Sequence, residues 1–142
     1  MTAYSTLDPV SAAVYGALNV AALTALAPGG VGDVIEQNTG FPYVLYEVSE
    51  ANLGGMGSKP GVGRRTLEVS VRVHVFSSYV GFIEAQQIMA TVIQLLADPP
   101  AVTGYGRAAI FHDDTVPLSA QIIAGVPVNE LVGLFRLYLT ET

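Results

Sequence analysis

The sequence predicts a single α+β domain over residues 1–142, with a mainly antiparallel sheet of four to five strands and two helices packed on one face. Three observations carry this prediction: an uncharged apolar stretch at residues 9–27, an alternating segment at 65–77, and a helical period at 80–97. Strand-like segments that follow one another with few helices between them are typical of antiparallel α+β folds. A long Gly-rich hairpin loop interrupts the predicted sheet.

The apolar stretch at residues 9–27 is predicted to be the first helix. Asp8 suits the N-cap, Pro9 suits the first helical turn, and Pro28 with the two following glycines ends the helix. A membrane span is the alternative, because the stretch carries no charge. It contains several small and polar residues and no basic segment precedes it, so a buried helix is the better interpretation and no membrane contact is expected.

Two strands are predicted on either side of the Gly-rich loop, after a short extended piece at residues 34–36. In the first, residues 43–50, Val44, Tyr46 and Val48 share one face and Leu45 lies on the other. The second strand covers residues 65–77. One of its faces is apolar (Leu67, Val69, Val71, Val73, Val75) and the other is polar (Thr66, Glu68, Ser70, Arg72, His74).

A second helix and further strands complete the chain. The helix at residues 80–97 places five apolar residues on one face, and the sequence Asp98-Pro99-Pro100 ends it. Strands are expected at 108–113, 118–123 and 128–140. The apolar helix face comprises Phe82, Ala85, Met89, Val92 and Leu96, and Leu131, Phe135, Leu137 and Leu139 share one face of the last strand.

The Gly-rich loop at residues 52–65 is predicted to be a flexible arm that docks on a partner. Three of the six cationic residues of the chain lie in it or at its end. A phosphate-binding loop is excluded by spacing, because Ser58 precedes Lys59 and a strand rather than a helix follows. The expected docking residues are Asn52, Leu53, Met56, Lys59, Arg64 and Arg65.

Composition indicates a protein that assembles with other subunits. Charged residues make up 13% of the chain, against a typical share of about 25%, so much of the surface is expected to be covered. The net charge of −6 argues against a general nucleic-acid binder, and the absence of cysteine excludes thiolate chemistry. An oligomer interface or the wall of a lumen is expected on the polar face formed by Glu68, Ser70, Arg72, His74, Arg136 and Tyr138.

Catalytic signals are weak. His112, Asp113 and Asp114 are the one cluster of metal-ligating types, but neighbours on a strand point to opposite faces, so a turn or bulge would be needed to bring them together. No Gly-x-Ser-x-Gly elbow is present. The chain is therefore expected to be no enzyme and to bind no cofactor. A small metal-dependent hydrolase using His112 and Asp114 is a remote alternative.

The order of elements resembles the tail terminator, or tail completion, proteins of long-tailed bacteriophages. The resemblance rests on a helix, the segment Phe41-Pro42-Tyr43-Val44-Leu45-Tyr46, the glycine-rich loop, the Val69-x-Val71-x-Val73-x-Val75-Phe76-Ser77 strand, and a helix that opens with Glu84-Ala85 and closes with Leu95-Leu96. It covers residues 9–97, and the last strands match by position.

This resemblance implies a hexameric homo-oligomeric ring in the virion, at the head–tail junction, after assembly in the host cytoplasm. Such a ring caps the tail tube protein, ends tube polymerisation and presents the tail to the head-side connector, or stopper, protein. DNA only passes through its lumen, which an acidic subunit suits because like charges repel. A head-side neck protein and a tail tube subunit are the alternatives.

Overall fold

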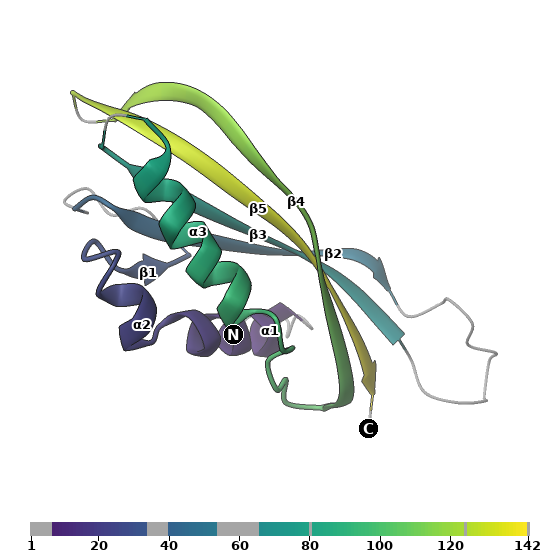
Figure 1. Ribbon diagram of the computed structural model, residues 1–142. Coiled ribbons are helices and arrows are strands. Elements are labelled where there is room, and N and C mark those ends of the chain that lie inside the picture. The colour runs from purple at the N-terminus through teal and green to yellow at the C-terminus, as the bar shows by residue number, and fades with distance from the viewer. Residues whose placement is uncertain (1–6, 34–39, 54–65, 80, 124, 142) are drawn as a thin grey trace.

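The structure, a computed structural model, describes residues 7–33, 40–53, 66–79, 81–123 and 125–141. Its helices are α1 (Leu7–Leu18), α2 (Ala21–Thr24) and α3 (Ile83–Leu95), and its strands are β1 (Val31–Gly32), β2 (Tyr43–Leu53), β3 (Thr66–Ser77), β4 (Tyr105–Ile123) and β5 (Val126–Glu141). The strands form one sheet in the order β1-β2-β3-β5-β4 (Figure 1). The predicted α+β class and the mainly antiparallel sheet are confirmed.

The sheet is antiparallel except at one edge. β2 pairs with β3, β3 with β5 and β5 with β4, all antiparallel, whereas β1 pairs in parallel with β2. The alternation in β3 places Val69, Val71, Val73 and Val75 at zero exposure against the helices. The period-2 pattern therefore gave the correct faces, because a strand with one covered side must alternate.

The first helix differs from its prediction. It ends at Leu18, and a separate turn of helix, α2, follows, so residues 9–27 do not form one continuous helix. Asp8 lies within α1 rather than at its N-cap. The chain bends at Val20, which has an extended backbone, and this bend lets Leu23 and Ala27 reach the same core as Val14. The expected extended piece at 34–36 lies outside the described residues.

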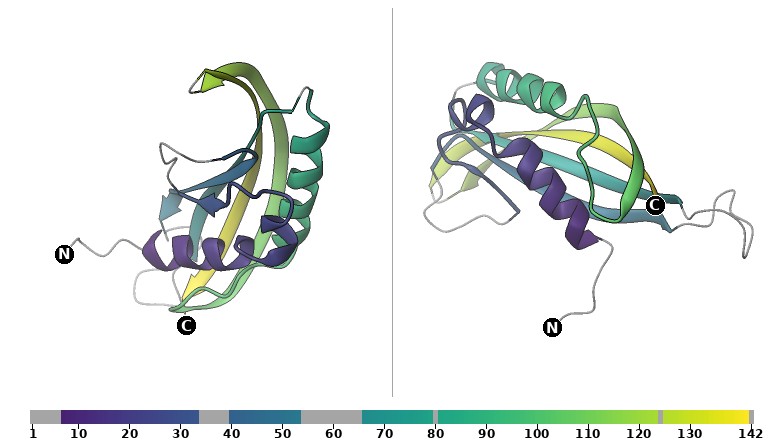
Figure 2. Two further views of the ribbon diagram at one scale, coloured as in Figure 1. Left: turned by 90° about the vertical axis from the view of Figure 1, so that its left-hand side faces the viewer. Right: turned by 90° about the horizontal axis from the view of Figure 1, so that it is seen from below.

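The helices cover one face of the sheet, and one core lies between the two layers. α1 contacts β2, and α3 contacts β3 and β5. Figure 2 shows α1 and α3 as separate rods on the covered side of the curved sheet. Ile88 joins the expected apolar face of α3, and the Ser77 hydroxyl donates to Glu84 at 2.6 Å, which ties the end of β3 to the first turn of α3.

The two strands expected at 108–113 and 118–123 are one long strand, β4. Its pairing with β5 shifts register between Tyr105 and Arg107, between His112 and Asp114, and between Leu118 and Gln121. Bulges insert extra residues and bend a strand without ending it. The β4–β5 hairpin accordingly arches over one end of the molecule (Figure 2), and Gly125, with φ +80°, forms part of its turn.

Candidate functional site

The sheet face away from the helices, called the second face below, carries the polar side chains that the sequence singled out. Glu68, Ser70, Arg72 and His74 alternate on β3 with the buried valines, and Arg136 and Tyr138 alternate on β5 with buried leucines. In the register, Glu68 lies opposite Tyr138 and Ser70 opposite Arg136. The structure thus places all six residues on one surface, in two groups.

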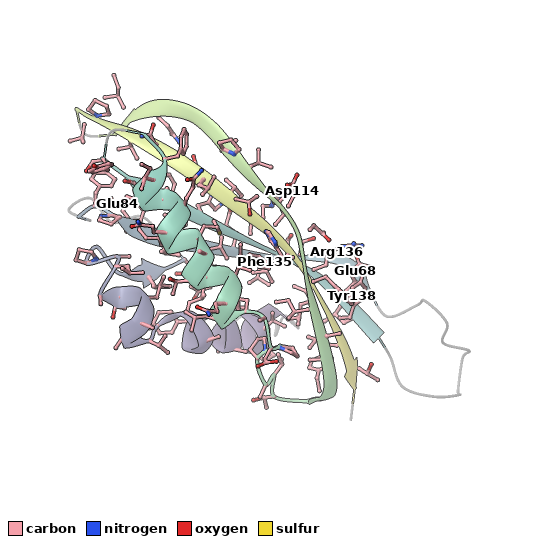
Figure 3. All side chains as sticks on the ribbon, in the orientation of Figure 1. Glu68, Glu84, Asp114, Phe135, Arg136 and Tyr138 are labelled. Carbon is pink, nitrogen blue, oxygen red and sulfur yellow. The ribbon has the colours of Figure 1, made fainter. Side chains whose placement is uncertain are left out.

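The first group surrounds Arg136. Its guanidinium donates to both carboxylate oxygens of Asp113, at 2.7 and 3.0 Å, and to the Tyr138 hydroxyl at 3.1 Å. Asp113 raises the pKa of Arg136, by hydrogen bonding and by its charge. Figure 3 shows Arg136 and Tyr138 beside Glu68 at the end of the sheet that leads to residues 54–65. Phe111 on β4 packs edge-on against Tyr138, so this group is a mixed polar and aromatic patch.

The second group centres on His74, which touches a carboxylate on each side of its ring. Nε2 lies 2.5 Å from Glu47 Oε1 on β2, and Nδ1 lies 2.5 Å from Glu130 Oε2 on β5. The Gln121 amide of β4 donates to the other oxygen of Glu130. Glu47 is exposed, whereas Glu130 is 6% exposed. One imidazole therefore links β2, β3 and β5, and Gln121 adds β4.

An aromatic row continues from His74 towards β2. Ring centroids are 6.1 Å apart for His74 and Phe76, 4.8 Å for Phe76 and Tyr43, and 5.4 Å for Tyr43 and Phe41. Together with Val128, Tyr43 and Phe76 form a small apolar cluster separate from the main core. Burial, and then the nearby charge of Glu130, raise the pKa of Tyr43.

Both edges of the sheet offer backbone for further pairing. β1 pairs with β2 only at Val44 and Leu45. β4 forms the opposite edge along its whole length. Three exposed apolar side chains lie on β4: Phe111 (54% exposed), Leu118 (40%) and Ile122 (76%). An edge of this length with apolar side chains is a site at which another strand can add.

Two of the residues expected in the docking loop lie in a strand instead. Asn52 and Leu53 belong to β2, where they pair with Glu68 and Leu67 after a register shift beyond Glu50. The sequence missed this because a bulge breaks the alternation that marks a strand. The other expected loop residues, Met56, Lys59, Arg64 and Arg65, lie outside the described residues.

The cluster at His112 does not converge. His112 Nε2 lies 2.7 Å from Thr115 Oγ1, and its ring packs on Phe135. Asp113 faces Arg136, and Asp114 accepts a hydrogen bond from the backbone N–H of Thr115. A bulge is present here, yet in the described part of the chain no group of three His, Cys, Asp or Glu residues is placed to hold a metal ion.

Sequence reasoning missed the partners of His74. Glu47 meets His74 through the register of β2 on β3, and Glu130 meets it because the strand order places β5 directly beside β3. The only signal in the sequence was the alternation of side chains between the two faces of each strand. It could indicate a shared face but not which residues meet on it.

The helices of the described residues include none with the length and apolar character of a membrane span. Comparison with curated proteins finds no match. Among solved structures, a chain of the virion of a native gene transfer agent particle matches with a TM-score of 0.73 over 97% of this chain and 99% of that chain, at 19% identity, which shows a shared fold.

The model of a protein family, tail completion protein gp17, matches residues 12–121. The match spans part of α1, all of α2 and α3, and β2, β3 and most of β4, and it agrees with the resemblance found in the sequence. The chain therefore belongs to the tail completion protein gp17 family, a family of structural proteins of bacteriophage tails.

Proposed function

We propose that this protein forms a closed ring, a hexamer, that caps the phage tail tube, ends tube polymerisation and joins the tail to the head-side connector. The assembling unit is a single domain of residues 1–142. Assembly takes place in the host cytoplasm, and the finished ring lies at the head–tail junction. The protein performs no covalent chemistry and needs no cofactor in this role.

The observation that carries the proposal is the pair of open sheet edges. The four long strands alternate in direction in the order β2-β3-β5-β4, so β2 and β4 run in opposite directions. β4 is one edge of the sheet, and the outer side of β2 is covered by β1 only at Val44 and Leu45. When β4 of one copy lies beside β2 of the next, the two strands are antiparallel and the alternation continues around a ring. Head-to-tail contacts of this kind close when the rotation between copies closes.

Side chains on β4 support the same contact. Phe111, Leu118 and Ile122 expose apolar surface in a chain with few charges, and burial against a neighbour removes it from water. In the ring, the second face with Glu68, Ser70, Arg72, His74, Arg136 and Tyr138 borders the neighbour or the lumen, through which DNA passes. Residues 54–65, with Met56, Lys59, Arg64 and Arg65, are the proposed docking arm.

Two other roles in the particle are alternatives to the tail-capping ring. A head-side neck protein would form a ring at another level of the particle, and a tail tube subunit would polymerise alone into long tubes. Labelling the position of the protein along purified virions separates the first from a terminator, and imaging of the purified protein separates the second.

Ring formation is tested by mass photometry and negative-stain imaging of the purified protein. We expect closed six-fold rings for the natural sequence. Leu118→Lys places a charge on the β4 edge and should lower the ring fraction at least about tenfold, because charging an edge strand opposes pairing with another strand.

The matched control is Ile83→Lys on α3, which places the same charge at a side chain that is 63% exposed but lies in the helical layer. It should leave the rings intact. Monomers at all concentrations for the natural sequence, or an equal loss in both variants, would contradict the role of the β4 edge. Long tubes in place of rings would favour the tube subunit.

A further inference from the structure

The two contacts of His74 on the second face need two N–H donors, and a neutral imidazole has only one. A neutral ring carries a hydrogen on one nitrogen only, and an ionised carboxylate accepts hydrogen bonds but donates none. Both ring nitrogens lie 2.5 Å from a carboxylate oxygen, Nε2 from Glu47 and Nδ1 from Glu130. The bridged arrangement is therefore satisfied when both nitrogens are protonated, which is one proton more than the neutral ring holds.

The two carboxylates are not equivalent. Glu130 is buried and is held on its other oxygen by the Gln121 amide, so it is fixed in place. Glu47 is exposed and free to turn. Loss of one proton from the ring therefore leaves Nδ1–H bonded to Glu130 and removes the hydrogen bond to Glu47.

A cationic side chain, that of Arg72, lies beside Glu47 in the strand pair. Arg72 on β3 lies directly opposite Glu47 in the register, and His74 is its diagonal neighbour. Directly opposite and diagonal side chains on one face of a sheet are both within contact reach. Among the described residues, the titratable groups around His74 are Glu47 and Tyr43 on β2, Arg72 on β3 and Glu130 on β5. β4 contributes the neutral amide of Gln121.

We propose that Glu47, His74 and Glu130 form a proton-operated clamp across β2, β3 and β5, with Arg72 as the alternative partner of Glu47. With the extra proton, His74 holds both carboxylates and the clamp is closed. Without it, Glu47 swings to Arg72 and the clamp is open. The closed state binds one proton more than the open state, so falling pH favours it and rising pH opens it.

The clamp changes the charge pattern of the second face at a defined place. Opening removes the positive charge beside Glu130 and transfers Glu47 to Arg72, so the net charge of the cluster falls by one. The device belongs to the single protomer and does not depend on the proposed ring, so its failure and the failure of ring formation are separate outcomes.

Nitrogen-15 NMR of the imidazole rings tests the clamp in the intact protein. The chain has two histidines, so His112→Gln leaves the signals of His74 alone. We expect two protected ring N–H signals at the acid end of the folded range, because each hydrogen is held by a carboxylate. As pH rises, the Nε2–H signal should vanish while the Nδ1–H signal remains.

Variants separate the clamp from a general charge effect. Glu47→Ala should lose the protected Nε2–H signal at every pH, and Asp98→Ala, which removes an exposed charge after α3, should keep both signals. Arg72→Gln should move the loss of Nε2–H to higher pH, because Glu47 then has no second partner. Arg136→Gln removes a charge of the same sign from the same face, beside Asp113 rather than Glu47, and should leave the transition in place.

Three results would overturn the proposal. A single protected N–H throughout the folded range rules out the doubly bonded ring. Two signals that survive Glu47→Ala show that Glu47 does not hold Nε2–H. Equal shifts in the Arg72 and Arg136 variants show that Arg72 acts through its charge alone and is not the alternative partner.

Discussion

Tyr43 and Tyr46 lie on opposite faces of β2, and their hydroxyl groups differ in whether they have a hydrogen-bond partner. Both are nearly fully buried, and burial raises the pKa of each. Tyr46 faces the helices and shares a hydrogen bond with Ser11 of α1. The hydroxyl of Tyr43 is buried on the second face and makes no hydrogen bond among the described residues. A buried polar group without a partner costs about 1–3 kcal/mol of folding free energy. The Tyr43 hydroxyl therefore destabilises the fold, whereas the Tyr46 hydroxyl stabilises it through its hydrogen bond.

Replacing each tyrosine by phenylalanine should therefore give different results in urea unfolding. Tyr43→Phe removes an unpartnered hydroxyl and should leave the free energy of unfolding unchanged or raise it by up to about 1 kcal/mol. Tyr46→Phe loses its bond to Ser11 and should lower it by about 1 kcal/mol. Equal losses in the two variants would show that the Tyr43 hydroxyl has a partner in solution.

The raised pKa of Tyr43 also sets the sign of an alkaline effect. The folded chain keeps this proton to a higher pH than the unfolded chain, whose tyrosines titrate near pH 10. The contribution to stability is fully present below about pH 10 and is lost as the pH rises through the folded pKa. The fall in unfolding free energy above pH 10 should be shallower in Tyr43→Phe than in the natural sequence, and an identical slope would contradict this account.

Gly29 fixes the connection between α2 and β1. Its N–H donates to the Pro42 carbonyl at 2.9 Å, and a Cβ at this position would lie 2.0 Å from the Gly40 carbonyl oxygen and 2.7 Å from that of Pro42. The obstacles are backbone atoms, which cannot turn aside as a side chain can. Only glycine lets the two segments approach this closely.

Gly29→Ala should lower the free energy of unfolding by at least about 2 kcal/mol, in the range of overpacked sites. Gly16 is the matched control, because it lies in α1 and a Cβ there meets nothing within 4 Å. Gly16→Ala should raise stability by about 0.5–1 kcal/mol, because alanine is the better helix former. Thermal or urea unfolding of both variants measures the contrast, and a harmless Gly29→Ala would place the turn differently from the structure.

Strand ends were harder to predict than strand faces. The alternation in β3 depends only on which residues face the core, and it held for every valine of that strand. β4 was divided in two because its bulges interrupt the same alternation, and β2 was ended too early for the same reason. A bulge is stabilised by the partner strand, so the local pattern of one strand does not reveal it.

At the scale of the whole molecule, ring formation and the docking of residues 54–65 on a partner can be tested separately. Deleting residues 54–63 keeps the paired ends of β2 and β3, including Asn52 and Leu53, and leaves both sheet edges in place. We expect such a variant to form rings as the natural protein does but to lose stable joining of tails to heads, because docking by the arm is removed.

Complementation of a phage that lacks this protein measures the joining step, as the yield of particles in which tails are attached to filled heads. Mass photometry of the same variant is the control for ring formation. Normal attachment without the arm would remove its docking role, whereas a loss of rings would place the arm in the subunit contact instead.

The sequence by itself determined the class of fold, the covered faces of β2, β3 and β5, the apolar face of α3 and the resemblance to tail completion proteins. These follow from local periodicity, because a residue's side of a strand or helix depends on its neighbours in the chain. Only the tertiary structure decided that β5 lies beside β3, that His74 meets Glu47 and Glu130, and that β4 forms one edge of the sheet while β1 covers only Val44 and Leu45 of β2 at the other. Those features depend on strand order and register, which are set by packing between segments far apart in the sequence.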